Sequence, residues 1–427
     1  MTKGAKYDSI KGAWRLTHED KSALVPCARV GHTIQELPRK PSQLEPFLLL
    51  LGGANLDDTL DEAFVFSTSD GTWSKLNWMV EPLSGPTLSR YEHASAVLPD
   101  GDVIVFGGAT KSCPLGDLLE LKVTHNPPLT GLSISPNSSS SSTFPGESRT
   151  QHGSACLTEH GQLLIFSGGA MGNQPVSDIQ VHIYDTKSKS WSSVHTTGQT
   201  PCVRLGHLLI YQYPSTEPLD AADLHRIPRG RMLIHGGMAE EKFFDDFYQM
   251  QFSEVDESHL TGIWCKFVNK SSTDTVSDRM ALQDENNLWQ TGRVPCARAA
   301  HGGVCLNGSG NSICIAKVYI FGGVSTAGAL NDMHCFDTQT KQWTEITFNG
   351  PVPKPRFDFA CCSYMRTSVD NSQVYTGQYC FFLHGGMDTD GHVYNDSWTI
   401  VLAEQVLDGS SAITHLIGSS AKLSISE

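Results

Sequence analysis

Val103-Ile104-Val105-Phe106-Gly107-Gly108 is an apolar run that ends in two glycines, and runs of this kind occur six times in the chain. Each run has the length of a buried β-strand and is too short for a helix. A glycine pair at its end indicates a sharp turn or a close approach of neighbouring backbone. The six pairs are Gly52-Gly53, Gly107-Gly108, Gly168-Gly169, Gly236-Gly237, Gly322-Gly323 and Gly385-Gly386.

Other residues recur around each glycine pair. The first glycines are 55, 61, 68, 86 and 63 residues apart, and self-similarity at such a period is typical of a repeat architecture. An arginine lies upstream of each pair, and in five units a histidine follows it by three positions; Phe359 takes that place in the sixth unit. The arginines are Arg29, Arg90, Arg149, Arg204, Arg298 and Arg356, and the histidines are His32, His93, His152, His207 and His301. An acidic residue follows each pair: Asp61, Asp117, Asp178, Asp246, Asp332 and Asp396.

A tryptophan follows the third strand of four units, at Trp73, Trp191, Trp264 and Trp343, and the second unit has none. Each unit therefore reads as four short strands, and six such units predict an all-β, six-bladed β-propeller. The sixth unit has no convincing fourth strand, whereas Trp14-Arg15-Leu16-Thr17 is a strand without a unit. Joining the two closes the ring and removes exposed sheet edges, so we expect closure by an N-terminal strand.

The domain organisation follows from these units. We expect an N-terminal tail over residues 1–13, a propeller over 14–402 and a C-terminal tail over 403–427. Insertions are predicted at 133–142, 211–230 and 269–290, the first of which contains an unbroken run of five serines, Ser138 to Ser142. Their polar composition is typical of loops, where added chain is tolerated.

Composition limits the classes of partner. The chain of 427 residues carries 31 basic and 45 acidic residues, a formal net charge of −14, which argues against a nucleic-acid partner. The first 20 residues lack the apolar core of a secretory signal, and no apolar run approaches the about 18–20 residues that span a bilayer. We expect a cytoplasmic protein. Its 12 cysteines form no Cys-x-x-Cys unit, so most are expected to be buried thiols.

The histidines allow two interpretations. They could form a metal ring near the axis, or each could be a packed strand residue that recurs because the blade recurs. Recurrence in five units favours packing, because a metal site normally gathers unlike ligands at one place. The acidic residues are interpreted as turn residues that satisfy backbone N–H groups. No nucleophile elbow or phosphate-binding loop is found, so we expect no metal, no cofactor and no enzymatic activity.

The arginines also allow two interpretations. They could brace neighbouring loops through hydrogen bonds. Alternatively, they could form a basic ring at the channel mouth that binds an acidic peptide, and we take all six as candidate partner-binding residues. The loops after the glycine pairs differ in chemistry on a repeated scaffold, as an interaction surface requires.

The spacing of glycine pairs, aromatic residues and tryptophans resembles the kelch-repeat family, over residues 14 to 402. The stretches that carry the resemblance are Pro26 to His32, Arg90 to Ser95, Asn173 to Asp178 and Ala327 to Leu330. Within the family it is similar to effectors of a Rab-nine-type GTPase. This resemblance implies a GTP-bound Rab partner, transport from late endosomes to the trans-Golgi network and peripheral recruitment to endosomal membranes. It also implies contact with a FYVE-type phosphoinositide kinase. The alternatives are a substrate-recognition module of a ubiquitin ligase and a metal-dependent kelch enzyme.

Overall fold

A computed structural model describes most of the chain, and every structural statement below refers to the residues it describes. These are residues 13–17, 24–39, 45–79, 87–124, 131–134, 143–157, 161–213, 230–256, 259–269, 287–306, 316–369 and 375–407. Within them the regular elements are all β-strands. No helix in this part of the chain has the length and hydropathy needed to cross a membrane.

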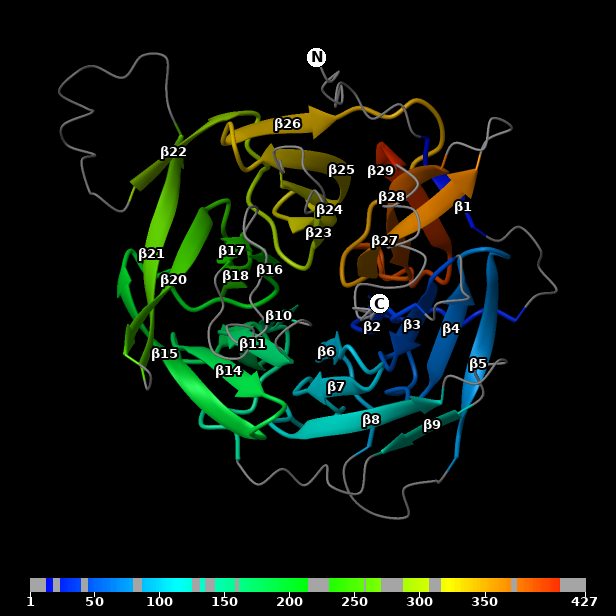
Figure 1. The fold of residues 1–427 in the computed structure, drawn as a ribbon, viewed down its shortest axis with the longest axis horizontal. Coiled ribbons are helices and arrows are strands. Elements are labelled where there is room, and N and C mark those ends of the chain that lie inside the picture. Colours follow the sequence, from blue (N-terminus) through cyan, green and yellow to red (C-terminus); the bar gives the residue numbers. More distant parts are fainter. Residues whose placement is uncertain are drawn as a thin grey trace, which may run out of the picture.

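Antiparallel pairing groups most of the strands into six four-stranded sheets, and parallel pairs between outer strands join some of these into larger sheets. Figure 1 shows the strands arranged in a ring around a central axis. The first three sheets are β2 (Thr33–Glu36), β3 (Phe47–Leu51), β4 (Ala63–Ser67) and β5 (Thr72–Trp78); β6 (Ala94–Val97), β7 (Val103–Phe106), β8 (Leu118–Thr124) and β9 (Gly131–Ile134); and β10 (Gly153–Leu157), β11 (Gln162–Phe166), β14 (Val181–Asp185) and β15 (Ser190–Gly198). The second three are β16 (Leu208–Gln212), β17 (Arg231–His235), β20 (Phe247–Asp256) and β21 (His259–Asn269); β23 (Gly302–Leu306), β24 (Lys317–Ser325), β25 (Gly328–Asp337) and β26 (Gln342–Ile346); and β27 (Ala360–Val369), β28 (Tyr375–His384) and β29 (Ser397–Leu407) with β1 (Arg15–Leu16). The predicted all-β propeller is confirmed.

The ring closes through the N-terminal strand, as predicted. β1 pairs antiparallel with β29, with Arg15 opposite Thr399. The strand itself is short and its Leu16 is 40 % exposed, whereas the preceding Trp14 is only 1 % exposed. The Trp14 ring packs 5.0 Å from Phe321 and 5.9 Å from Phe381, measured between ring centroids. Closure is therefore anchored by a buried side chain more than by a long strand.

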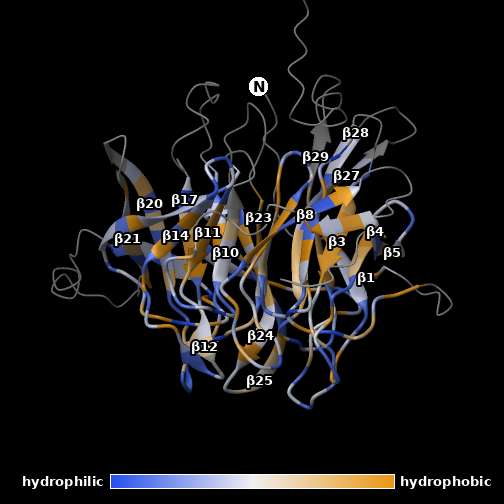
Figure 2. Cartoon of the chain, turned by 90° about the horizontal axis from the view of Figure 1, so that it is seen from below, coloured by the Kyte–Doolittle hydropathy of each residue, from blue (hydrophilic) through white to orange (hydrophobic). Residues whose placement is uncertain are grey.

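The hydrophobic core lies between neighbouring sheets. The strand before each glycine pair is apolar on both faces, and in β3 the side chains of Leu48 to Leu51 are all at most 1 % exposed. Two-sided burial is what a strand sandwiched between two neighbouring sheets requires. Across the joint between the first and sixth sheets, for example, the Phe66 and Phe382 rings are 4.9 Å apart. Figure 2 shows the same pattern, with hydrophobic colour concentrated on the strands and hydrophilic colour mostly on the coloured loops that connect them.

Several boundaries differ from the predicted ones. Ser133 and Ile134 belong to β9, so the serine-rich insertion begins after them. β29 continues to Leu407 because its end pairs with Tyr375 in β28, which moves the propeller boundary beyond residue 402. Residues 135–142, 214–229, 270–286 and 408–427 lie outside the described part of the chain.

An additional strand, β22 (Asn287–Gly292), takes up the last residues of the predicted insertion at 269–290. It pairs in parallel with β21 and β26 and so links the fourth and fifth sheets. Gln290 in this strand is 3 % exposed, and its side-chain oxygen accepts a hydrogen bond of 2.9 Å from the indole N–H of buried Trp343. A polar residue is structural here because a buried tryptophan N–H needs an acceptor.

Candidate functional site

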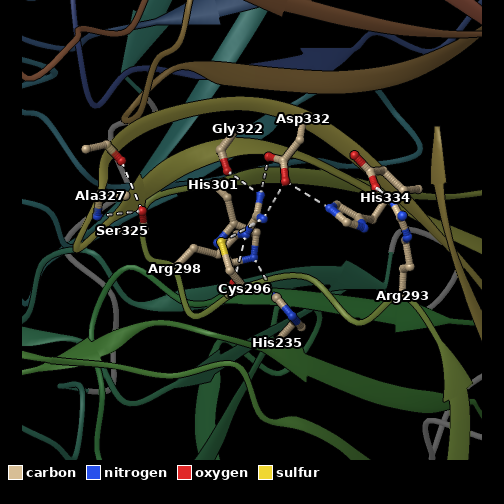
Figure 3. Close-up of polar contacts among 12 residues, drawn as sticks. His235, Arg293, Cys296, Arg298, His301, Gly322, Ser325, Ala327, Asp332 and His334 are labelled. Carbon is tan, nitrogen blue, oxygen red and sulfur yellow. Dashed lines mark hydrogen bonds and ion pairs between the residues drawn. The ribbon is translucent and has the colours of Figure 1, made fainter. Parts of the chain in front are cut away.

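Each of the six predicted arginines is buried, at most 1 % exposed, and paired with an acidic side chain. In the fifth sheet Arg298 makes two parallel hydrogen bonds of 2.7 Å to the carboxylate of Asp332 (Figure 3). Burial alone would raise the pKa of Asp332, but hydrogen bonds from Arg298 and His334 hold that pKa below its ordinary value. The other pairs are Arg29–Glu62 at 2.8 Å, Arg90–Asp117 at 2.9 Å, Arg149–Asp178 at 2.8 Å, Arg204–Asp246 at 2.5 Å and Arg356–Asp396 at 2.6 Å.

The guanidinium group connects several segments of one sheet. Arg298 also donates to the carbonyl oxygens of Gly322 at 3.0 Å and Cys296 at 3.1 Å. This geometry favours the bracing interpretation, because the positive charge is neutralised and turned inward. A basic ring at the channel mouth is not what the structure shows. Contact between these arginines and a partner stays a prediction, and their burial weighs against it.

The acidic residues have a different role from the predicted one, because they pair with the arginines as well as ending a loop. In the first unit the pairing residue is Glu62, and the predicted Asp61 is exposed. The longer glutamate reaches the same guanidinium from the next position. The spacing alone could not distinguish the two adjacent acids.

The glycine pairs allow the next sheet to approach. A Cβ on Gly236, whose φ is +64°, would lie 2.6 Å from the carbonyl oxygen of Arg298 in the following sheet and 3.0 Å from Cε1 of His301. Contacts this short exclude a side chain unless the backbone shifts. The pair is thus a joint between two sheets, and it terminates the strand as predicted.

In the third unit the joint is Ser167-Gly168 and not the predicted Gly168-Gly169. Both residues have positive φ, at 49° and 120°. The carbonyl oxygen of Ser167 accepts the hydrogen bond from Arg149 that the first glycine accepts elsewhere. The Ser167 hydroxyl accepts a hydrogen bond of 2.8 Å from the backbone N–H of Arg204, which offsets the strain of a left-handed serine.

The residue two positions after each arginine forms a closed ring around the axis. Its N–H donates to the carbonyl of the equivalent residue in the neighbouring sheet, with N···O distances from 2.6 to 3.2 Å. All six residues have φ between 47° and 62°. They are Gly31, Glu92, Gln151, Gly206, Ala300 and Asp358. We refer to this set as the axial ring; sequence analysis missed it because only two of the six are glycines.

A cavity of about 190 Å³ opens at the axial ring and is lined by its residues, the five repeated histidines and Phe359. The histidines are 4–9 % exposed. Burial, together with nearby arginines and histidines, lowers the pKa of His93 to about 3, and burial with Arg149 does the same for His152. The imidazoles are therefore neutral at pH 7. No group of three or more candidate ligands that could hold a metal was found in the described ranges.

Two carboxylates face this cavity. Glu92 accepts hydrogen bonds from the Gln151 amide at 2.6 Å and from the Thr150 hydroxyl at 2.5 Å. Burial raises the pKa of Glu92, and burial together with the charge of Glu92 raises the pKa of Asp358. The mouth of the channel thus carries acidic side chains where a basic ring was predicted.

Of the ten cysteines whose side chains the structure describes, three are buried, three are intermediate and four are exposed, so the expectation that most are buried is not met among them. Three of the exposed cysteines lie beside the buried arginines. The sulfur atoms of Cys27, Cys202 and Cys296 each accept a hydrogen bond of 3.3 Å from the arginine two positions later. The sequence signal is the recurring Pro-Cys-x-Arg in these three units.

The tryptophans pack between sheets. Trp264 and Trp343 are at most 1 % exposed, Trp73 is 5 % exposed, and Trp191 is partly buried. The second sheet has no tryptophan of its own. At its joint with the third sheet Phe144 fills the space, with its ring 4.7 Å from Phe106 and 4.8 Å from Trp191.

Comparison with known proteins agrees with this architecture. The chain matches the KLHDC2/KLHL20/DRC7 Kelch-repeats domain over residues 7–216 and 215–408. It is 28 % identical to the Rab9 effector protein with kelch motifs of Mus musculus over 88 % of this chain and 90 % of that protein. It is 33 % identical to the Homo sapiens protein of the same name over 52 % of each chain. Tip elongation aberrant protein 3 of Schizosaccharomyces pombe is 23 % identical over 41 % of this chain and 14 % of its own length. The six repeated joints and a family match along almost the whole chain place this protein in the kelch-repeat family.

Proposed function

We propose that the chain is a non-catalytic protein-interaction platform that acts as the effector of a Rab GTPase of the Rab-nine type. The observation that carries this proposal is the similarity to the murine Rab9 effector protein with kelch motifs over 88 % of the chain. That similarity covers far more of the chain than one common repeat.

The loops after the glycine pairs support a binding role. Each begins at the end of a buried strand, and each is held by a backbone bridge to the residue before the axial ring, as between Val30 and Ala54. The loops differ in form: the third contains the hairpin of β12 (Gly169–Met171) and β13 (Gln174–Pro175), and the fourth that of β18 (Met238–Ala239) and β19 (Lys242–Phe243). Different loops on one rigid scaffold are the usual basis of protein recognition.

The cellular role proposed with this activity is transport from late endosomes to the trans-Golgi network. The protein would reside in the cytoplasm, bind endosomal membranes peripherally through the GTP-bound GTPase, and contact a FYVE-type phosphoinositide kinase. These steps depend on Rab binding, which is therefore the step to test first.

Affinity capture on a panel of immobilised Rab proteins tests the proposal. Each Rab is loaded either with a non-hydrolysable GTP analogue or with GDP. We expect capture by a Rab-nine-type protein in the GTP form, at least tenfold stronger than in the GDP form, with weaker capture by the other Rab proteins. Equal recovery in both nucleotide states, or no recovery from any of them, would contradict an effector role.

A further inference from the structure

The face that carries the axial ring is acidic. The six loops after the glycine pairs contain six acidic residues and two lysines: Asp57, Asp58, Glu240, Glu241, Asp388 and Asp390 against Lys111 and Lys242. The repeated arginines do not balance this charge, because each is already paired with its own carboxylate. A partner approaching this face meets a negative potential, which steers positively charged surfaces toward it.

Two carboxylates stand at the centre of this face. Glu92 and Asp358 occupy axial-ring positions on either side of Gly31, and both line the cavity. Glu92 receives hydrogen bonds only from neutral groups, Thr150 and Gln151, among the described residues. The Asp358 carboxylate has neither a hydrogen bond nor an ion pair within the same ranges, so both acids lack a cationic partner.

The histidines deeper in the cavity provide a second, independent observation. His152 and His207 are more than nine-tenths buried and line the cavity, yet neither ring nitrogen of either residue has a hydrogen-bond partner in the described structure. A buried polar atom without a partner indicates a missing ligand or bound water. Burial lowers the pKa of both imidazoles, so they stay neutral and do not repel a cation. A neutral imidazole also offers one acceptor nitrogen.

We propose that the axial cavity is the receptor site for a lysine or arginine side chain of a protein partner, held by Glu92 and Asp358 at the mouth and by the imidazoles below them. The inference rests on the proposed role as an interaction platform and specifies the chemistry of its partner. A cationic side chain supplies N–H donors to acceptors that otherwise lack them. Each ring carbonyl already accepts one hydrogen bond between sheets, whereas the carboxylates of Glu92 and Asp358 have no cationic partner in the described structure. The surrounding acidic loops favour a basic protein surface over a free ion.

Nuclear magnetic resonance of protein labelled with ¹³C in its histidines tests the site directly. The probe is the peptide acetyl-Gly-Gly-Arg-Gly-Gly-amide, and its matched control carries citrulline, the neutral isostere of arginine. We expect the arginine peptide to shift the imidazole resonances saturably, with at least tenfold weaker binding of the citrulline peptide. Binding should weaken as the pH falls, because burial raises the pKa of both acids and protonation removes their charge.

Glu92→Gln combined with Asp358→Asn should reduce affinity at least tenfold. Gln151 already occupies this ring position at φ 47°, so an amide side chain is compatible with the backbone there. The control is Asp70→Asn with Asp100→Asn, which removes two exposed charges from turns at the opposite ends of the strands and should change affinity less than twofold. Equal affinity for the citrulline peptide, or full affinity in a folded Glu92→Gln/Asp358→Asn variant, would overturn the proposal. So would the lack of any shift in the wild-type protein.

The two proposals fail separately. Nucleotide-dependent Rab capture without any peptide effect would remove the axial site and leave the effector role. Saturable arginine-peptide binding without Rab capture would remove the effector role and leave a receptor site for a different basic partner.

Discussion

Around the axis every sheet makes the same backbone hydrogen bond to its neighbour, whereas at the outer edge the fourth strands differ in length and partner. The axial ring repeats one N–H to carbonyl bond six times. Outside, β21 runs from His259 to Asn269 while β1 contains only Arg15 and Leu16. Parallel contacts such as that between β15 and β21 link some outer strands, and β22 is inserted beside β26. The repeated motif therefore specifies the inner joints, and local packing specifies the outer edge.

The comparison teaches where a change should matter. An inner joint combines a buried ion pair, two residues of positive φ and a ring hydrogen bond, so a change to any of them alters a buried contact between sheets. At the outer edge a segment matters only where it buries a side chain.

Trp14 is the outer-edge residue with the largest expected effect. Trp14→Ala should lower the free energy of unfolding by about 3–5 kcal/mol, because it leaves a cavity between Phe321 and Phe381. Leu16→Ala, in the adjoining strand, should cost far less because Leu16 is 40 % exposed. Urea denaturation of both variants provides the measurement. Similar losses for the two would mean that strand pairing, and not the buried indole, closes the ring.

A buried and an exposed ion pair near the fifth sheet allow the inner joint and the outer edge to be compared directly. Asp332→Ala leaves the Arg298 guanidinium, 0 % exposed, without its carboxylate and should cost about 3 kcal/mol. Glu345→Ala breaks the pair with Arg293, where the side chains are 37 % and 80 % exposed, and should cost less than about 1 kcal/mol. Denaturation at pH 7 measures both. If Asp332→Ala were as mild as Glu345→Ala, the arginines would not brace the inner joints.

The buried histidines around the axis should make the free energy of unfolding depend on pH, with a smaller effect than the two changes above. The folded-state pKa of His152 is about 3, below the ordinary value near 6.5, so between these pH values the unfolded chain binds more protons than the folded one. Stability should therefore fall as the pH decreases through this window, by up to about 1.4 kcal/mol per pH unit for each such histidine. His152→Phe should flatten the slope, since Phe359 already fills the equivalent place in the sixth unit. The reverse change, Phe359→His, should steepen it. Urea denaturation at pH 7, 6 and 5 measures the free energy of unfolding as a function of pH. An unchanged slope in His152→Phe would contradict the burial of His152 as a neutral imidazole.

The sequence was sufficient for the fold because the glycine pairs, arginines and tryptophans are periodic. It was also sufficient for closure by Trp14, because an unassigned strand and an incomplete unit complement each other. The sequence did not predict which of two adjacent residues takes a given role. Glu62, and not Asp61, pairs with Arg29, and Ser167 takes the place of the first glycine in the third unit. Spacing alone does not distinguish such neighbours. The basic ring at the channel mouth was predicted because the sequence does not show that each arginine pairs with a carboxylate. That pairing is a contact between residues far apart in the chain. The axial acids escaped notice since Glu92 and Asp358 recur in no other unit.

Hydrogen exchange of the six axial-ring amides tests the central claim, that one uniform inner ring holds together an irregular outer edge. The account predicts that the N–H groups of Gly31, Glu92, Gln151, Gly206, Ala300 and Asp358 exchange slowly and with similar protection, through global unfolding, because each depends on the closed ring. The amides of β9 and β22 should exchange faster, through local opening. One or more ring amides exchanging as fast as those outer strands would show that the ring opens locally and would contradict the account.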